Sequence, residues 1–245
     1  MSERYKWRAA PVAAFLFIFG AYISVTHASM SVSPVRIDLS DEHRKDVVRV
    51  SNQDDAAKSY EVNVVAWSQT EERREVYAPT EELLAVPPLF TLQPGEEQIV
   101  RLGMLQDADA ITERTYRMFI TELAPPQPEE PAATGITMRV QIGVPVFVAP
   151  TALPTATLDY VDSMQVEEQL FMKFRNSGNT HVKVTEVQYL APGQTDKQVA
   201  PTGLYVLAGQ TGYLPVALPE GRPVGTVTVV TDTLGSLEYE LPVAP

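Results

Sequence analysis

The stretch "ITMRVQIGVPVFVAP", residues 136–150, constrains the fold more than any other part of the sequence. Apolar side chains recur at every second residue, at Ile136, Met138, Val140, Ile142, Val144, Val146 and Val148. Successive side chains of an extended strand point to opposite faces, so this period predicts a strand over 136–148. At roughly 3.3 Å per residue it would span about 43 Å, which is unusually long. Pro145 has no N–H for a ladder and favours a sheet edge. A long apolar edge strand is an aggregation hazard, so its presence needs a functional reason.

The rest of the chain is divided into short apolar runs by 20 prolines and 13 glycines. In "SVSPVRIDL", Val35, Ile37 and Leu39 alternate with polar residues and predict a core-facing strand. Further strands are expected in "DVVRVSN", "SYEVNVVAW", "PPLFTLQPGEEQIVRLGM", where a Pro-Gly turn separates two strands, and "RTYRMFITEL". Seven short strands before residue 150, with turn signals between them, predict an immunoglobulin-like sandwich.

The same pattern starts again after the Pro-rich stretch 150–154. Short runs such as "QLFMKFRNSG", "HVKVTEVQYL" and "GTVTVVTD" alternate with Gly, Pro and Asn turns. The sequence therefore predicts an all-β protein with two sandwich domains, at residues 29–150 and 151–245, and no helix of ordinary length with a clean period.

The first 28 residues have the layout of a secretory signal peptide. Three basic residues are followed by an apolar stretch and by small residues that end at Ala28. The alternative is a membrane anchor, but Pro11 and Gly20 interrupt the apolar stretch, which is short for a membrane span. We expect cleavage near Ala28, a mature chain without membrane insertion, and export to the periplasm.

Composition and motifs argue against catalysis and against nucleic acid as a partner. The formal net charge is −12, and the leader carries three basic residues against one acidic residue, so the mature chain is still more acidic. The chain has no cysteine, and its three histidines lack metal-ligand spacing. It contains no nucleophile elbow and no phosphate-binding glycine loop. We expect a non-enzymatic protein with no metal and no cofactor.

Three arginines lie inside apolar-rich strands, on the face opposite the core residues: Arg36, Arg101 and Arg117. Each alone fits the polar outer face of a sandwich strand. Together they could line a cleft for an anion, because arginine binds carboxylates through a bidentate fork.

Several segments together resemble the PapD-like periplasmic pilus chaperones of the chaperone–usher pathway, in detail the archaic branch associated with spore-coat-U-type subunits. The most specific are "VPPLFTLQPGEEQIVRL" and "ERTYRMFITELAP", supported by "SPVRIDLS", "AWSQT", "RVQIGVPVFVAP" and "FRNSGNTHV". The resemblance covers residues 30–245. It implies two immunoglobulin-like domains set as an L, with pilus or fimbrial subunits and an outer-membrane usher as partners.

The same resemblance supplies the reason for the long strand. Members of this family lend one strand to an incomplete pilus subunit, a form of β-strand addition. The matching donor positions are Ile136, Met138, Val140 and Ile142.

The family also anchors the subunit's terminal carboxylate with an arginine on the first strand and a lysine on the last. Arg36 matches the arginine, but Pro145 stands where the lysine would be. Arg117 is our substitute for it, and Arg101 is a weaker one. The alternatives to a chaperone are a two-domain β-sandwich binding module or adhesin component and, further off, a carbohydrate-active enzyme with converging carboxylates.

Overall fold

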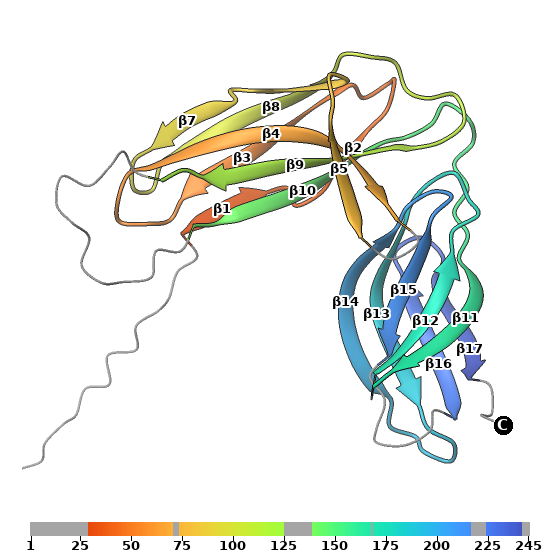
Figure 1. Ribbon diagram of the computed structural model, residues 1–245. Coiled ribbons are helices and arrows are strands. Elements are labelled where there is room, and N and C mark those ends of the chain that lie inside the picture. The colour runs from red at the N-terminus through yellow and green to blue at the C-terminus, as the bar shows by residue number, and fades with distance from the viewer. Residues whose placement is uncertain (1–28, 71–73, 125–138, 168, 217–223, 242–245) are drawn as a thin grey trace, which may run out of the picture.

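The computed structural model describes residues 29–70, 74–124, 139–167, 169–216 and 224–241. All regular elements in these ranges are strands. They form two β-sandwiches that meet at a bend, so that the molecule has the shape of an L (Figure 1). None of the described segments forms a helix long and apolar enough to cross a membrane.

The first sandwich packs a four-stranded sheet on a six-stranded sheet. The smaller sheet has the order β1-β3-β8-β6, with β1 Met30–Ser33, β3 Lys45–Asn52, β8 Glu97–Met104 and β6 Leu83–Val86. The larger sheet has the order β2-β10-β9-β4-β5, and β7 also pairs with β4. Its strands are β2 Ile37–Leu39, β10 Gln141–Val148, β9 Arg114–Glu122, β4 Lys58–Gln69, β5 Glu75–Pro79 and β7 Leu89–Leu92.

The core between these two sheets follows the alternation seen in the sequence. On β9, Tyr116, Met118 and Ile120 are buried, as the period of two predicts. The run "SVSPVRIDL" differs, because it is two strands and not one. The chain passes from the small sheet to the large one around Pro34, so Val35 lies outside both strands and is 72% exposed. Its predicted place in the core was wrong.

The second sandwich has a three-stranded sheet, β11-β12-β15, and a four-stranded sheet, β14-β13-β16-β17. The strands are β11 Asp159–Val166, β12 Gln169–Arg175, β13 Val182–Leu190, β14 Gln198–Val206, β15 Thr211–Val216, β16 Gly225–Thr231 and β17 Gly235–Leu241. They enclose a separate core that includes Phe174, Val187 and Val229. The first sandwich ends with β10 at Val148 and the second begins with β11 at Asp159, which agrees with two domains but leaves the boundary at residue 150 a prediction.

A small aromatic cluster joins the two sandwiches. Trp67 of β4 and Phe147 of β10 pack against Leu207 and Tyr205 of the second sandwich. Phe147 is 1% exposed, and its ring stacks on the His181 imidazole at 3.6 Å between centroids. Phe147 belongs to the face of β10 that points away from the core, so the second sandwich buries a side chain that one domain alone would expose.

Candidate functional site

Strand β10 has an unpaired edge. It pairs with β9 along its whole length, from Gln141 to Val148. On its other side it pairs with β2 over Val146–Val148 only. Within the described part of the chain, the stretch from Gln141 to Pro145 therefore has no strand beside it. Its backbone groups on that side can accept another strand.

Two of the predicted donor side chains lie at this end of β10. Val140 and Ile142 are partly buried and pack against the core of the first sandwich. The Val140 carbonyl accepts a hydrogen bond from the Glu122 N–H at 2.9 Å, so pairing with the β9 strand continues one residue before β10 begins. Ile136 and Met138 lie outside the described residues. The described strand begins at Gln141 and is eight residues long. The predicted strand over 136–148 was therefore too long at residues 139 and 140, which are described and lie outside it.

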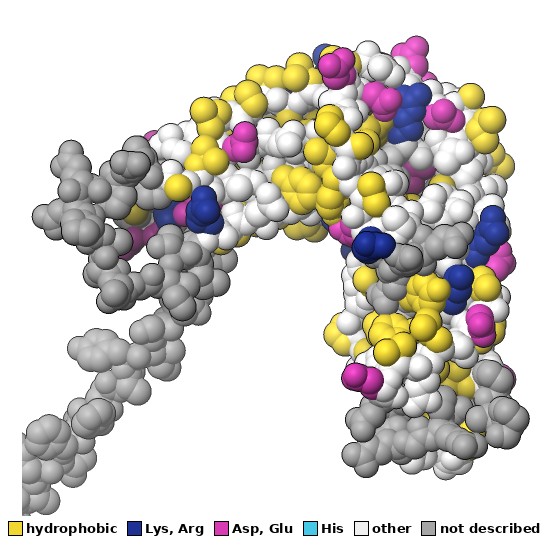
Figure 2. All heavy atoms as spheres, viewed as in Figure 1, with side chains coloured by type: hydrophobic (Ala, Val, Ile, Leu, Met, Phe, Trp, Pro, Cys, Tyr) yellow, Lys and Arg dark blue, Asp and Glu magenta, His cyan; other side chains and the backbone are white. Residues whose placement is uncertain are grey.

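The structure brings two of the three arginines to one face of the large sheet. Arg117 is the register partner of Pro145. On the other side of β10, Val146 pairs with Ile37, so Arg36 comes next to the position of Pro145. Arg36 lies just before β2 and not inside a strand, so that part of its predicted placement was wrong. Arg36 and Arg117 therefore flank Pro145, with their Cα atoms about 10 Å apart at two strand spacings. Figure 2 shows apolar side chains gathered on the underside of the first sandwich, where Figure 1 places β9 and β10.

Arg117 is held firmly on this face. Its guanidinium carbon lies 4.0 Å from the centroid of the Trp67 ring, a cation–π contact. Its Nη2 donates to Glu75 Oε1 at 3.0 Å, and the side chain is 14% exposed. Gly143 helps to make room for it, because a Cβ there would lie 3.2 Å from the Arg117 Cδ and 3.0 Å from the Phe119 ring.

Arg36 connects the two sandwiches. Its Nε donates to Asp38 and its Nη1 to Asp232, both at 2.9 Å, and Asp232 belongs to the turn between β16 and β17. Burial opposes its charge, but these two carboxylates raise the pKa of Arg36 above its ordinary value. The guanidinium also lies 6.0 Å from the Phe147 ring centroid. Arg36 is therefore a charged residue at the bend that pairs with carboxylates of both sandwiches.

Arg101 lies elsewhere. It is an exposed residue of β8, between Val47 and Val86 in the small sheet. A groove of about 610 Å³ runs past it, with exposed Val47, Leu84, Val86 and Leu105 along its length. It belongs to the opposite sheet and does not meet the other two arginines.

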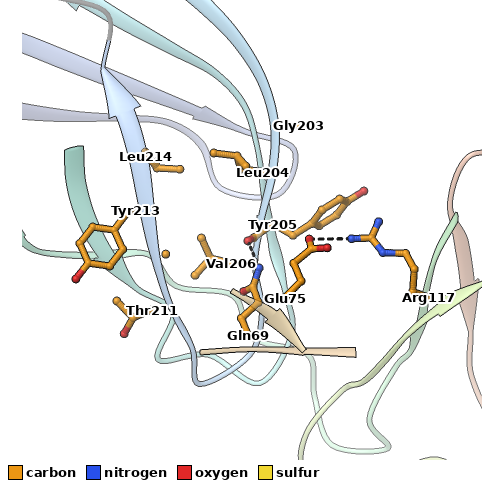
Figure 3. A pocket seen from close by; sticks show the side chains of 11 residues that line it. Gln69, Glu75, Arg117, Gly203, Leu204, Tyr205, Val206, Thr211, Tyr213 and Leu214 are labelled. Carbon is orange, nitrogen blue, oxygen red and sulfur yellow. Dashed lines mark hydrogen bonds and ion pairs between the residues drawn. The ribbon is translucent and has the colours of Figure 1, made fainter. Parts of the chain in front are cut away.

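Sequence reasoning missed the residues around Arg117. A pocket of about 130 Å³ lies at the bend, between the β4–β5 arm and strands β14 and β15 (Figure 3). Its lining includes Gln69, Glu75, Arg117 and Tyr205. The Gln69 side chain donates to the Tyr205 carbonyl at 2.9 Å and accepts from the Leu207 N–H at 3.1 Å, which ties the arm to the second sandwich. The segment "AWSQT" was a signal for this place, but nothing in it states which residues it would meet.

Residues 29–154 match the family model of the pili and flagellar-assembly chaperones, PapD N-terminal domain. The chain belongs to this family. It is 23% identical over 133 residues to the chaperone protein PapD of Escherichia coli, and the match spans 54% of each protein. The chain thus spans about half the length of the curated relative that it matches.

Solved structures agree with the fold over most of the chain. A chain of the CsuC–CsuE chaperone–tip adhesion subunit complex of Acinetobacter baumannii superposes with a TM-score of 0.64 at 15% identity. That match covers 87% of this chain and 98% of the other chain. The Salmonella enterica complex of the SafA pilin with the SafB chaperone gives a TM-score of 0.59 at 20% identity, covering 89% and 99%. The predicted all-β fold of two immunoglobulin-like domains in an L is confirmed.

Proposed function

We propose that this chaperone binds and stabilises a pilus or fimbrial subunit by lending it strand β10. The observation that carries the proposal is the edge from Gln141 to Pro145, which has no strand beside it among the described residues. A partner strand that pairs there gains main-chain hydrogen bonds, while alternate side chains supply specificity. This use would account for an apolar strand kept at an open edge.

The side chains in phase with the core would enter the subunit. Val140 and Ile142 are only partly buried and still have apolar surface to give. Fully burying such a side chain contributes about 1.5–3 kcal/mol before the costs of association. Because Val140 and Ile142 are already partly buried, each would contribute only part of this free energy to binding. Ile136 and Met138 continue the same alternation in the sequence, and we assign them the same role.

Arg36 and Arg117 are our proposed anchor for the subunit's terminal carboxylate. They flank the position of Pro145 and lie at the bend where a strand paired with β10 would arrive. A carboxylate removed from water must be paired, and arginine offers two parallel N–H donors. Arg101 lies on the other sheet and serves as a control for this role.

The remaining parts of the proposal follow from the family. Pilus chaperones of the chaperone–usher pathway are periplasmic, and we propose that residues 1–28 direct this chain there. Delivery of the bound subunit to an outer-membrane usher completes the cycle. No step in it requires catalysis, a metal or a cofactor.

Co-expression tests the proposal. The chain is produced in the periplasm together with a candidate pilus subunit, and the amount of soluble subunit is measured with and without the chain. Amide hydrogen exchange on the purified complex then locates the contact. We expect new protection at the amides of residues 141–144, since Pro145 has no amide hydrogen. A stable complex without that protection would contradict strand donation by β10.

A further inference from the structure

Arg117 already has a carboxylate partner inside this chain. Glu75, the first residue of β5, accepts a hydrogen bond from its Nη2 at 3.0 Å. Figure 3 shows the pair beside the pocket at the bend. The arginine side chain is 14% exposed and the glutamate side chain is 43% exposed. The cation is therefore fixed in the protein, whereas the carboxylate that meets it lies at the surface.

Glu75 accepts a hydrogen bond from only one of the two N–H groups, Nη2–H and Nε–H, on this edge of the guanidinium group. Its other oxygen, Oε2, accepts from the Tyr77 hydroxyl instead of from Arg117. The Nε–H of Arg117 is buried and has no acceptor among the described residues, and the same is true of the Nε1–H of Trp67. Buried donors are nearly always paired. The Arg117 guanidinium stacks on the Trp67 ring. Their two unpaired N–H groups therefore lie close together and indicate an acceptor that the described chain does not provide.

The strand that carries Glu75 is the least packed part of this region. All five residues of β5 are exposed, and its only strand partner in the described chain is β4. Gln69, the register partner of Glu75, is fixed to the second sandwich by its two hydrogen bonds. The base of the arm is therefore anchored, while the neighbouring pocket of about 130 Å³ leaves the Glu75 side chain room to turn away.

We propose that Glu75 is an internal competitor for the carboxylate site at Arg117, one that an incoming carboxylate must displace. This inference rests on the proposed anchoring role of Arg117. In the free chaperone Glu75 neutralises a largely buried cation through one hydrogen bond. A ligand carboxylate replaces it and can use both Nη2–H and Nε–H, the bidentate geometry that arginine favours. The competition lowers the affinity of the site for anions that lack further contacts, and it selects a carboxylate delivered together with a paired strand.

The test uses acetate as the carboxylate probe and the purified full chain. Nuclear magnetic resonance follows the Arg117 Nε–H and Trp67 Nε1–H signals, identified with the Arg117→Lys and Trp67→Phe variants. Sodium chloride at matched ionic strength is the anion control. We expect Glu75→Gln, which keeps the side-chain shape without its charge, to bind acetate about two- to fivefold more tightly than the wild type, the range of a partly exposed ion pair.

Glu97→Gln is the matched control variant. Glu97 also pairs with a surface arginine, Arg49, at 2.8 Å, and its side chain is 44% exposed, but the pair lies in the small sheet. It should bind acetate like the wild type. Glu75→Asp, which keeps the charge on a shorter side chain, should bind acetate with intermediate affinity.

The outcomes separate the two proposals. Equal acetate affinity in Glu75→Gln and the wild type overturns the competitor role, while loss of subunit capture by Arg117→Ala would still support the anchor. No response of either signal in any variant overturns both the competitor and the anchor, although co-expression would still measure strand donation. An equal gain in Glu97→Gln would show a general charge effect and also overturns the inference.

Discussion

Pro145 of β10 lies directly opposite Arg117 of β9. Opposed residues of an antiparallel pair have Cβ atoms about 4.5–5.5 Å apart, so a long arginine side chain can reach over its neighbour's position. The resemblance to pilus chaperones implies a lysine at the position of Pro145. In the proposed anchor, Arg117 supplies the cation from the adjacent strand in place of one on β10, and Arg36 supplies a second from the other side.

The first prediction concerns these two arginines. Arg36→Ala and Arg117→Ala should each weaken subunit capture by about 2–5 kcal/mol, the usual range for truncating one partner of a buried charge pair. If both arginines hold one carboxylate, the double variant should lose less than the sum of the two. Binding of the purified subunit to the three variants measures this.

Arg101→Ala is the control, since Arg101 lies on the opposite sheet. It should capture the subunit nearly as well as the wild type. Stability must be measured in parallel, because Arg36 pairs with Asp232 across the bend, an interaction worth about 1 kcal/mol or less. Wild-type affinity in Arg117→Ala would mean that the missing lysine at Pro145 is replaced elsewhere or not at all.

The large features of the fold could be predicted because they depend on local alternation. The buried residues of β9 follow from a period of two. Seven strands were expected before residue 150, whereas the described chain forms ten there, because several of the apolar runs divide into shorter strands. The error at Val35 has a physical cause. Alternation shows which residues share a face only while the strand continues, and it does not show that the chain changes sheets near Pro34.

The site could be predicted only in part because its members meet through register and domain packing. The sequence shows that Arg36 and Arg117 oppose their core residues, but not that β10 brings them to the two sides of Pro145. Phe147 alternates with the core-facing Val146 and Val148, so within one sandwich its position predicts exposure. Its burial depends on the second sandwich, which alternation within one strand cannot reveal.

The second prediction concerns the donor strand. Ile142→Asp should reduce subunit capture strongly, because desolvating the carboxylate in an apolar groove costs several kcal/mol. Ile142 also packs against the chaperone's own core, so some stability will be lost as well. Met104→Asp is a matched control, since Met104 is partly buried against the same core but lies on β8. We expect both variants to lower the unfolding midpoint. Only Ile142→Asp should lower subunit capture by more than the loss of stability explains. Normal subunit capture by Ile142→Asp would count against a donor strand in which the Ile142 side chain enters the subunit.

The third prediction concerns the bend. Phe147→Ala removes a ring that packs on Trp67, Tyr205 and His181, and it should cost about 3–5 kcal/mol. Because the cluster joins the two sandwiches, small-angle scattering should show a larger radius of gyration, while circular dichroism retains the β signal. Phe147→Leu, which fills most of the volume, should cost less than about 1.5 kcal/mol. An unchanged radius in Phe147→Ala would show that other contacts fix the bend.

The fourth prediction concerns export. Protein recovered from the periplasm should begin near Ser29, because residues 1–28 have the basic, apolar and small-residue order of a signal peptide. N-terminal sequencing of that fraction decides it. A chain that keeps residues 1–28 in the membrane fraction would favour an anchor.

The last prediction concerns alkaline pH. Tyr116 is buried in the first core, and burial together with its hydrogen bond to Glu82 raises the pKa of its phenol well above the ordinary value near 10. Below about pH 10 the phenol is neutral in both the folded and the unfolded state, so its contribution to stability is fully present. Above that pH the unfolded chain ionises while the folded phenol stays protonated. Stability is therefore lost as pH rises toward the folded pKa.

Urea unfolding at a series of pH values from about 7 to 11 tests this, with Tyr116→Phe as the comparison. The variant should be less stable near neutral pH by about 1 kcal/mol, because it loses one hydrogen bond. Above about pH 10, its free energy of unfolding should fall less steeply with pH than that of the wild type, by up to about 1.4 kcal/mol per pH unit. Burial also raises the pKa of Tyr60, Tyr77 and Tyr239, but these contribute the same slope to both proteins and cancel in the comparison. Parallel curves for the two proteins would show that Tyr116 can ionise without unfolding the first sandwich.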